Sequence, residues 1–115
     1  MGVSIYYKFK SSNDLNKNGF LKGTEEMWAK AFDGSPYESW CWYEPLVEKK
    51  IFRKVYTYEG ATSLPLDEDL GPKSAVFAVN LLTKIRRKVE GFDWSVQFDD
   101  LEVQWDEDSK KFQLV

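Results

Sequence analysis

The sequence predicts an α+β fold, a two-layer sandwich in which two helices cover one face of an antiparallel sheet. Three observations support this prediction. An alternating apolar pattern opens the chain, an amphipathic helical pattern covers residues 74–90, and the C-terminal segment contains alternating stretches that pair with one another in a consistent register. The chain has 115 residues, so we expect residues 1–115 to form one domain.

The first strand is predicted over residues 3–10, VSIYYKFK, where every second residue is apolar. One face would carry Val3, Ile5, Tyr7 and Phe9. The first helix is predicted to begin at Thr24, whose hydroxyl can cap it, and to end before Gly34. Its apolar face would carry Met27, Trp28, Ala31 and Phe32.

In the middle of the chain, the sequence pattern predicts one strand and one long connection. Residues 35–45, SPYESWCWYEP, fit either a strand or an irregular loop, and Lys50 to Tyr58 is rich in β-forming residues. Residues 59–73 contain two prolines and two glycines, which favours an irregular connection. The second helix is then expected from Ser74, a capping residue, to just before Gly91.

The C-terminal segment predicts a three-strand meander. A turn at residues 99–100 places Phe98 opposite Leu101, and it continues the apolar pairing along the two strands. A second turn at residues 108–109 places Trp105 opposite Phe112 and Asp106 opposite Lys111. Apolar pairing and charge pairing require the same register. The further expected pairs are Val96 with Val103, Trp94 with Trp105, Val103 with Leu114, and Glu107 with Lys110.

Composition restricts the classes of function. The chain contains no histidine, which is the commonest general acid or base, and it contains no catalytic motif, so we expect a protein that is not an enzyme. The net charge of −3 argues against nucleic-acid binding. We expect no membrane span and a cytoplasmic location, with the single cysteine, Cys41, as a buried structural thiol.

One metal-type pattern occurs, in the stretch DLNKNGFLKGTE at residues 14–25. Its spacing resembles an EF-hand calcium loop, D-x-[DN]-x-[DN]-G-x₅-E. The resemblance covers 12 residues and implies side-chain or carbonyl ligands from Asp14, Asn16, Asn18, Phe20 and Glu25. A predicted strand precedes the loop where an EF-hand has a helix, and only two carboxylates are in the ligand set. A polar turn is therefore the main interpretation, and weak calcium binding is the alternative.

Two further groups are candidate binding residues. The aromatic group comprises Tyr37, Trp40, Trp42 and Tyr43, which would be either core or a surface for a partner. The acidic group comprises Asp67, Glu68 and Asp69, in the long connection.

These observations favour a small non-catalytic module that binds another protein through an acidic surface with aromatic contacts, as inhibitors, immunity proteins and adaptors do. A weak calcium-binding module is one alternative, and an aromatic-lined domain for a small ligand or sugar is another. The last strand, KKFQLV, would be an open sheet edge, through which two copies of the chain would form a homodimer.

Overall fold

The computed structural model of the chain describes residues 3–17, 19–32, 40–64, 68–99 and 101–113. The strands are β1 (Val3–Ser11), β2 (Leu46–Lys49), β3 (Lys54–Leu64), β4 (Phe92–Phe98), β5 (Leu101–Glu102), β6 (Gln104–Asp106) and β7 (Lys111–Gln113). The helices are α1 (Phe20–Ala31) and α2 (Leu70–Lys88). The predicted α+β class is confirmed.

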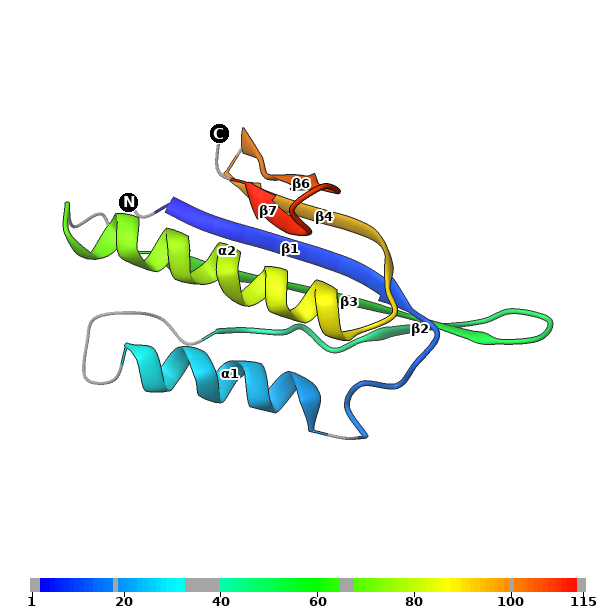
Figure 1. Cartoon of the computed structure of the whole chain (residues 1–115). Helices are drawn as coiled ribbons and strands as arrows, with labels where there is room; N and C mark the ends of the chain where they lie inside the picture. The colour runs from blue at the N-terminus through cyan, green and yellow to red at the C-terminus, as the bar shows by residue number, and fades with distance from the viewer. Residues whose placement is uncertain (1–2, 18, 33–39, 65–67, 100, 114–115) are drawn as a thin grey trace.

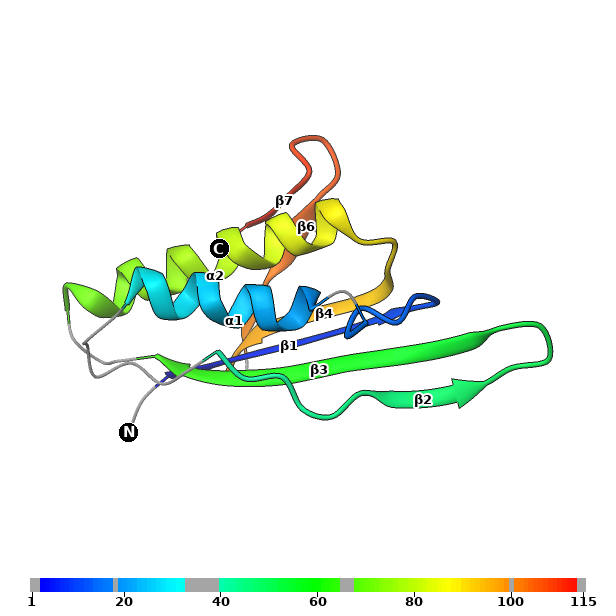
Figure 2. The same ribbon diagram turned by 90° about the horizontal axis from the view of Figure 1, so that it is seen from below.

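The main sheet has the strand order β2-β3-β1-β4-β5, and every neighbouring pair is antiparallel. From β1 to β4 the connectivity is that of the split β-α-β arrangement. Both helices lie on one face of this sheet, as Figures 1 and 2 show. The core between the two layers contains Ile5, Tyr7 and Phe9 from β1, and Leu82 and Ile85 from α2.

The first strand follows its sequence pattern. Ile5, Tyr7 and Phe9 are buried, as the alternation predicted. The β1 strand pairs with β3 over its whole length, from Val3 opposite Leu64 to Ser11 opposite Tyr56. For this reason β3 continues well beyond Tyr58, and the prediction of an irregular connection from residue 59 is wrong as far as Leu64.

Both helices begin earlier than their predicted capping residues. The α1 helix begins at Phe20, directly after Gly19, whose φ of 66° turns the chain into the helix. Thr24 is therefore inside α1, where its hydroxyl donates to the Leu21 carbonyl at 2.6 Å. In α2, the hydroxyl of Ser74 donates to the Gly71 carbonyl at 2.8 Å. Hydroxyls that can cap a helix also satisfy carbonyls one turn earlier, and this ambiguity misplaced both predicted starts.

The C-terminal segment keeps its predicted pairs but divides its middle strand. Phe98 pairs with Leu101, and Trp105 pairs with Phe112, as the register predicted. The chain leaves the main sheet at Val103, so β6 and β7 form a separate two-stranded sheet. Trp94 and Trp105 are consequently not strand neighbours. Glu107 and Lys110 form the expected ion pair at 3.0 Å, and Leu114 lies outside the described residues.

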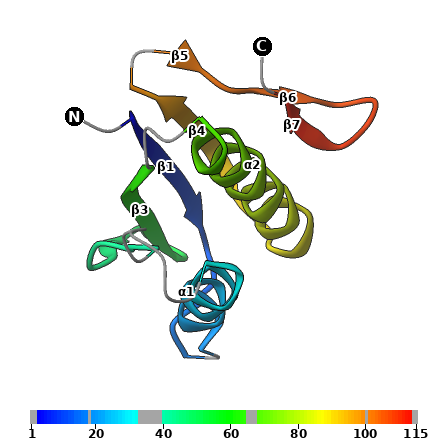
Figure 3. The ribbon, with the colours of Figure 1, turned by 90° about the vertical axis from the view of Figure 1, so that its left-hand side faces the viewer.

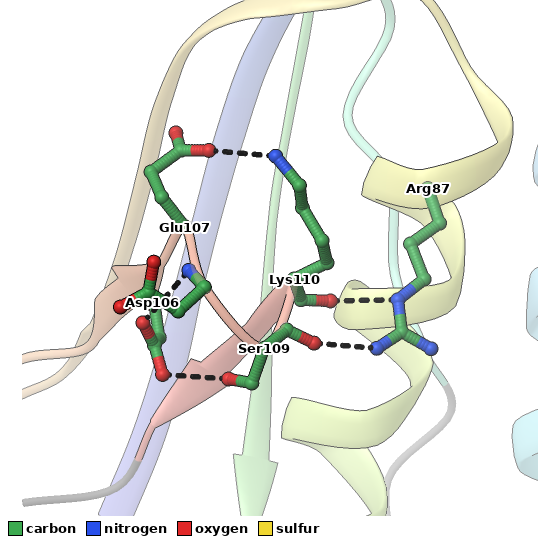
Figure 4. A network of polar contacts seen from close by, with 6 residues as sticks. Arg87, Asp106, Glu107, Ser109 and Lys110 are labelled. Carbon is green, nitrogen blue, oxygen red and sulfur yellow. Dashed lines mark hydrogen bonds and ion pairs between the residues drawn. The ribbon is translucent and has the colours of Figure 1, made fainter.

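The β6–β7 hairpin packs on α2 instead of extending the sheet (Figure 3). The Arg86 guanidinium lies 4.2 Å from the ring centroid of Trp105 and 5.6 Å from that of Trp94. The neighbouring Arg87 donates to the carbonyls of Lys110 and Ser109 at 2.6 and 3.2 Å (Figure 4). These two arginines, in the last turn of α2, thus hold the hairpin against the helix.

Candidate binding surface on the β2–β3 hairpin

The predicted strand at residues 50–58 contains a turn near its start. The backbone N–H of Lys50 donates to the Arg53 carbonyl at 2.7 Å, which leaves Ile51 and Phe52 at the apex of a hairpin. This hairpin extends beyond the layer of helices (Figure 2). Ile51 is 90% exposed and Phe52 is 98% exposed.

These two residues are poorly suited to their position in an isolated monomer. Tight hairpin turns favour glycine, asparagine and aspartate, because those residues adopt turn geometry and tolerate water. Burial of an isoleucine or phenylalanine side chain contributes about 1.5–3 kcal/mol, and neither residue gains that stabilisation here. Neither has a positive φ. The fold of the monomer therefore gives no reason for an apolar apex.

A cationic collar surrounds the apex. It consists of Lys49, Lys50, Arg53 and Lys54, which are all exposed, on a chain whose net charge is −3. Within the collar, Lys50 contacts Glu48 at 3.3 Å, and the Arg53 guanidinium lies 5.8 Å from the ring centroid of Phe92. The charge of the molecule is thus unevenly distributed, with a positive hairpin on an acidic protein.

Apolar exposure continues down the outer strand of the hairpin. The β2 strand is the terminal strand of the main sheet, with Leu46 62% and Val47 46% exposed. Tyr43, just before β2, is 51% exposed. We define the hairpin surface as Tyr43, Leu46, Val47, Ile51 and Phe52. A large exposed apolar group along an open sheet edge is characteristic of an interaction site.

The predicted aromatic surface is mostly interior. Trp40 is 2% exposed and stacks on Tyr7, with ring centroids 4.3 Å apart. Trp42 is half-buried, and its indole N–H donates to the Thr24 hydroxyl at 2.8 Å. These two tryptophans fill the space between α1 and the sheet. Only Tyr43 of this group joins the hairpin surface, and Tyr37 lies outside the described residues.

A hydrogen-bond network fixes the aromatic segment to the sheet. The buried Tyr7 hydroxyl donates to the Cys41 carbonyl at 2.5 Å, and its oxygen lies 2.8 Å from the Thr62 hydroxyl. Burial raises the pKa of Tyr7. Gly60 lies beneath this ring, and a Cβ there would come within 2.5 Å of Tyr7 Cε2. Cys41 itself is exposed, so the predicted buried thiol is wrong; the side chain alternates with the inward tryptophans.

The calcium-type loop forms a turn that leads into α1. The Asp14 carboxylate accepts a hydrogen bond from the Asn16 N–H at 3.1 Å, which is an Asx turn. Because α1 already begins at Phe20, Glu25 lies in the second turn of the helix rather than at the end of a loop. Among the residues that the structure describes, no three Asp, Glu, Cys or His side chains gather at one point. Asn18 lies outside the described residues.

The same loop borders a cleft of about 760 Å³. Its wall combines Asp14 and Lys17 from the loop with Lys88, the last residue of α2, and Glu90, which follows the helix. The Tyr58 hydroxyl anchors the loop, because it donates to the Asn13 carbonyl at 2.9 Å and accepts from the Leu15 N–H at 2.8 Å. The cleft thus has a mixed-charge wall and lies beside Phe20, the first residue of α1.

The acidic group does not join the hairpin surface. Glu68 and Asp69 are exposed just before α2, and Asp67 lies outside the described residues. Sequence reasoning missed the hairpin surface, because EKKIFRKV contains none of the residues that signal a turn. The available signal for this surface was the apolar pair Ile51–Phe52 with two cationic residues on each side of it.

Comparison with known proteins supplies no relative. No protein-family model, curated protein or solved structure matches the chain. In the part of the chain that the structure describes, neither helix is long and apolar enough to cross a bilayer.

Proposed function

We propose that this chain is a non-catalytic binding module that docks a protein partner through the hairpin surface. The observation that carries the proposal is the apex, where Ile51 and Phe52 are 90% and 98% exposed. A partner that covers both side chains gains their burial without ordering the backbone, because the hairpin already fixes it; only the rotamer freedom of the two side chains is lost. A small number of well-packed residues commonly supplies most of the free energy of binding at an interface.

The edge position of β2 supports a polypeptide as the partner. An open edge strand presents backbone N–H and carbonyl groups that only another chain can pair in a ladder. The collar supports fast and specific association, because its cations attract a partner surface of opposite charge. The binding surface proposed here is therefore basic and apolar, in place of the acidic and aromatic surface that the sequence suggested.

Differential capture tests this function. The wild-type chain, immobilised as bait in lysate of its source cells, is expected to retain one protein in stoichiometric amount. The double variant Ile51→Ser/Phe52→Ser is expected to lose it. A matched double variant, Met27→Ser/Val76→Ser, removes two apolar side chains that are 42% and 50% exposed on the helices, and it should retain the partner.

The retained protein is then purified, and its affinity for the three baits is measured by calorimetry. Loss of two well-buried apolar contacts should weaken binding by at least 100-fold for the apex variant. Equal affinity of all three baits would show that the hairpin is not the binding surface. Circular dichroism of each bait establishes that the substitutions leave the fold intact.

A further inference from the structure

We infer that the partner of the hairpin surface is a second copy of this chain, joined by antiparallel pairing of two β2 strands about a two-fold axis. This inference rests on the proposed function, since it names the occupant of the same surface. A two-fold interface uses one patch twice, so that patch must be complementary to itself. The backbone, the side chains and the charges of the hairpin each meet this requirement.

The backbone of β2 selects the centre of the pairing. Lys50 directs its N–H toward Arg53 on the β3 side of the hairpin. Hydrogen-bonding direction alternates along a strand, so Glu48 and Leu46 also face β3. Val47 and Lys49 then present their backbone groups to the open edge. In a pairing centred on Val47, each Val47 donates to and accepts from the same residue of the other copy.

The side chains agree with this centre. Pairing Val47 with itself places Lys50 of one copy beside Glu44 of the other, and both residues are exposed. It places Ile51 beside Tyr43, which is 51% exposed. Cation meets carboxylate and apolar residue meets apolar residue. A centre one residue later would instead place the two Glu48 carboxylates opposite each other.

The charges favour an antiparallel arrangement of the two copies. Two cationic collars would repel each other at close range. In the proposed pairing they lie at opposite ends of the interface, because the apex of one copy lies beside residue 43 of the other. The two Lys49 residues, which are the nearest members of the two collars, would be four residue positions apart along the pairing, which is about 13 Å. This exceeds the screening length of about 8–10 Å at physiological salt.

Other occupants would use only part of this surface. An anionic lipid surface suits a cationic collar and an apolar apex, but it offers no ladder partner for the open backbone of Val47. A second copy pairs Val47 fully and offers the Pro45 carbonyl to the Lys49 N–H, although Pro45 has no N–H to donate in return. A second copy covers the apex, the edge and Tyr43 together. It also supplies carboxylates at the position of the collar, since Lys50, which already contacts its own Glu48 at 3.3 Å, would lie near a second carboxylate.

Sedimentation equilibrium of the full-length chain tests the inference. The wild-type chain is expected to sediment as a dimer that dissociates on dilution and in high salt. Val47→Lys places two ammonium groups at the two-fold axis and should give a monomer at all concentrations. Val76→Lys is the matched control, because Val76 is 50% exposed on α2 against 46% for Val47, and it should remain dimeric.

Charge exchange tests the register independently. Lys50→Glu and Glu44→Lys should each weaken dimerisation by 10-fold or more, because each sets like charges beside each other. The double variant Lys50→Glu/Glu44→Lys restores opposite charges and should recover most of the affinity. This rescue separates pairing across the axis from a general effect of charge on the hairpin.

Three outcomes would overturn the inference: a wild-type monomer at every concentration, an unchanged dimer for Val47→Lys, or a double variant no better than its parents. A monomer that cosediments with phosphatidylserine vesicles would assign the apex to a lipid surface. A monomeric wild type that still captures a different protein, and loses it in Ile51→Ser/Phe52→Ser, would leave the proposed function standing while this inference fails.

Discussion

Replacement of Tyr7 by phenylalanine is expected to lower the free energy of unfolding by about 2 kcal/mol. The substitution keeps the ring that stacks on Trp40 at 4.3 Å, so the aromatic packing of the core is preserved. It removes the hydroxyl that contacts the Cys41 carbonyl at 2.5 Å and the Thr62 hydroxyl at 2.8 Å. Tyr7 is 1% exposed, so water cannot easily replace these contacts.

The magnitude follows from two lost hydrogen bonds. Each contributes a net stabilisation of about 1 kcal/mol, and a buried acceptor left without its donor costs about 1–3 kcal/mol. For a domain of this size, about 2 kcal/mol corresponds to a fall of roughly 8 °C in the melting temperature. The adjacent Tyr6 is the matched control, because it points to the opposite face of β1 and is 46% exposed. Tyr6→Phe should change stability by less than about 0.5 kcal/mol.

Urea denaturation followed by tryptophan fluorescence measures both variants. Trp40 and Trp42 adjoin Tyr7, with ring centroids 4.3 and 4.9 Å from it, so the signal reports on this part of the core. If Tyr7→Phe were as stable as Tyr6→Phe, the hydroxyl would not hold the aromatic segment against the sheet.

The same variant makes a pH prediction. Burial raises the pKa of Tyr7 above its ordinary value of 10.0, so the folded state retains this proton at a pH where the unfolded state releases it. The contribution of the Tyr7 proton to the free energy of unfolding is fully present below pH 10. It is lost as pH rises further, by about 1.4 kcal/mol per pH unit. Burial also raises the pKa of Tyr58, which adds to the slope. Denaturation between about pH 9 and 11 should show a shallower fall for Tyr7→Phe. If the stability of the wild type and of Tyr7→Phe fell in parallel with pH, the raised pKa of Tyr7 would be contradicted.

Three further outcomes are expected. Gly60→Ala should destabilise the fold by about 2 kcal/mol or more in urea denaturation, because its Cβ would lie 2.5 Å from Tyr7 Cε2; an unchanged midpoint would refute this contact. Ile51→Asn/Phe52→Gly should change stability by less than about 1 kcal/mol while weakening association, since both replaced side chains are exposed in the monomer. Millimolar calcium should shift the melting temperature of the wild type no more than that of Asp14→Ala/Glu25→Ala. The reason is that the first turn of α1 would have to unwind before its carbonyls could bind an ion. A saturable shift that is lost in the double variant would establish calcium binding.

Much of the layer structure was predictable because it depends on short-range periodicity. Alternation in β1 placed Ile5, Tyr7 and Phe9 on the buried face, as the structure has them. The cross-strand pairs Phe98 with Leu101 and Trp105 with Phe112 followed from the same rule. The candidate site was not predictable in this way. Ile51 and Phe52 have the local sequence of a strand, and they form a turn because β2 folds back on the start of β3, with Lys49 opposite Lys54.

The sequence by itself determined the α+β class, the buried face of the first strand and the register of the two C-terminal hairpins, because each depends on residues close together in the chain. The tertiary structure decided the rest. It extended β3 to Leu64 along β1, and it placed β6 and β7 on α2 because Arg86 and Arg87 bind there. It also buried Trp40 against Tyr7 and left Ile51 and Phe52 in solvent. Burial depends on which distant elements cover a side chain, and local pattern carries no information about that.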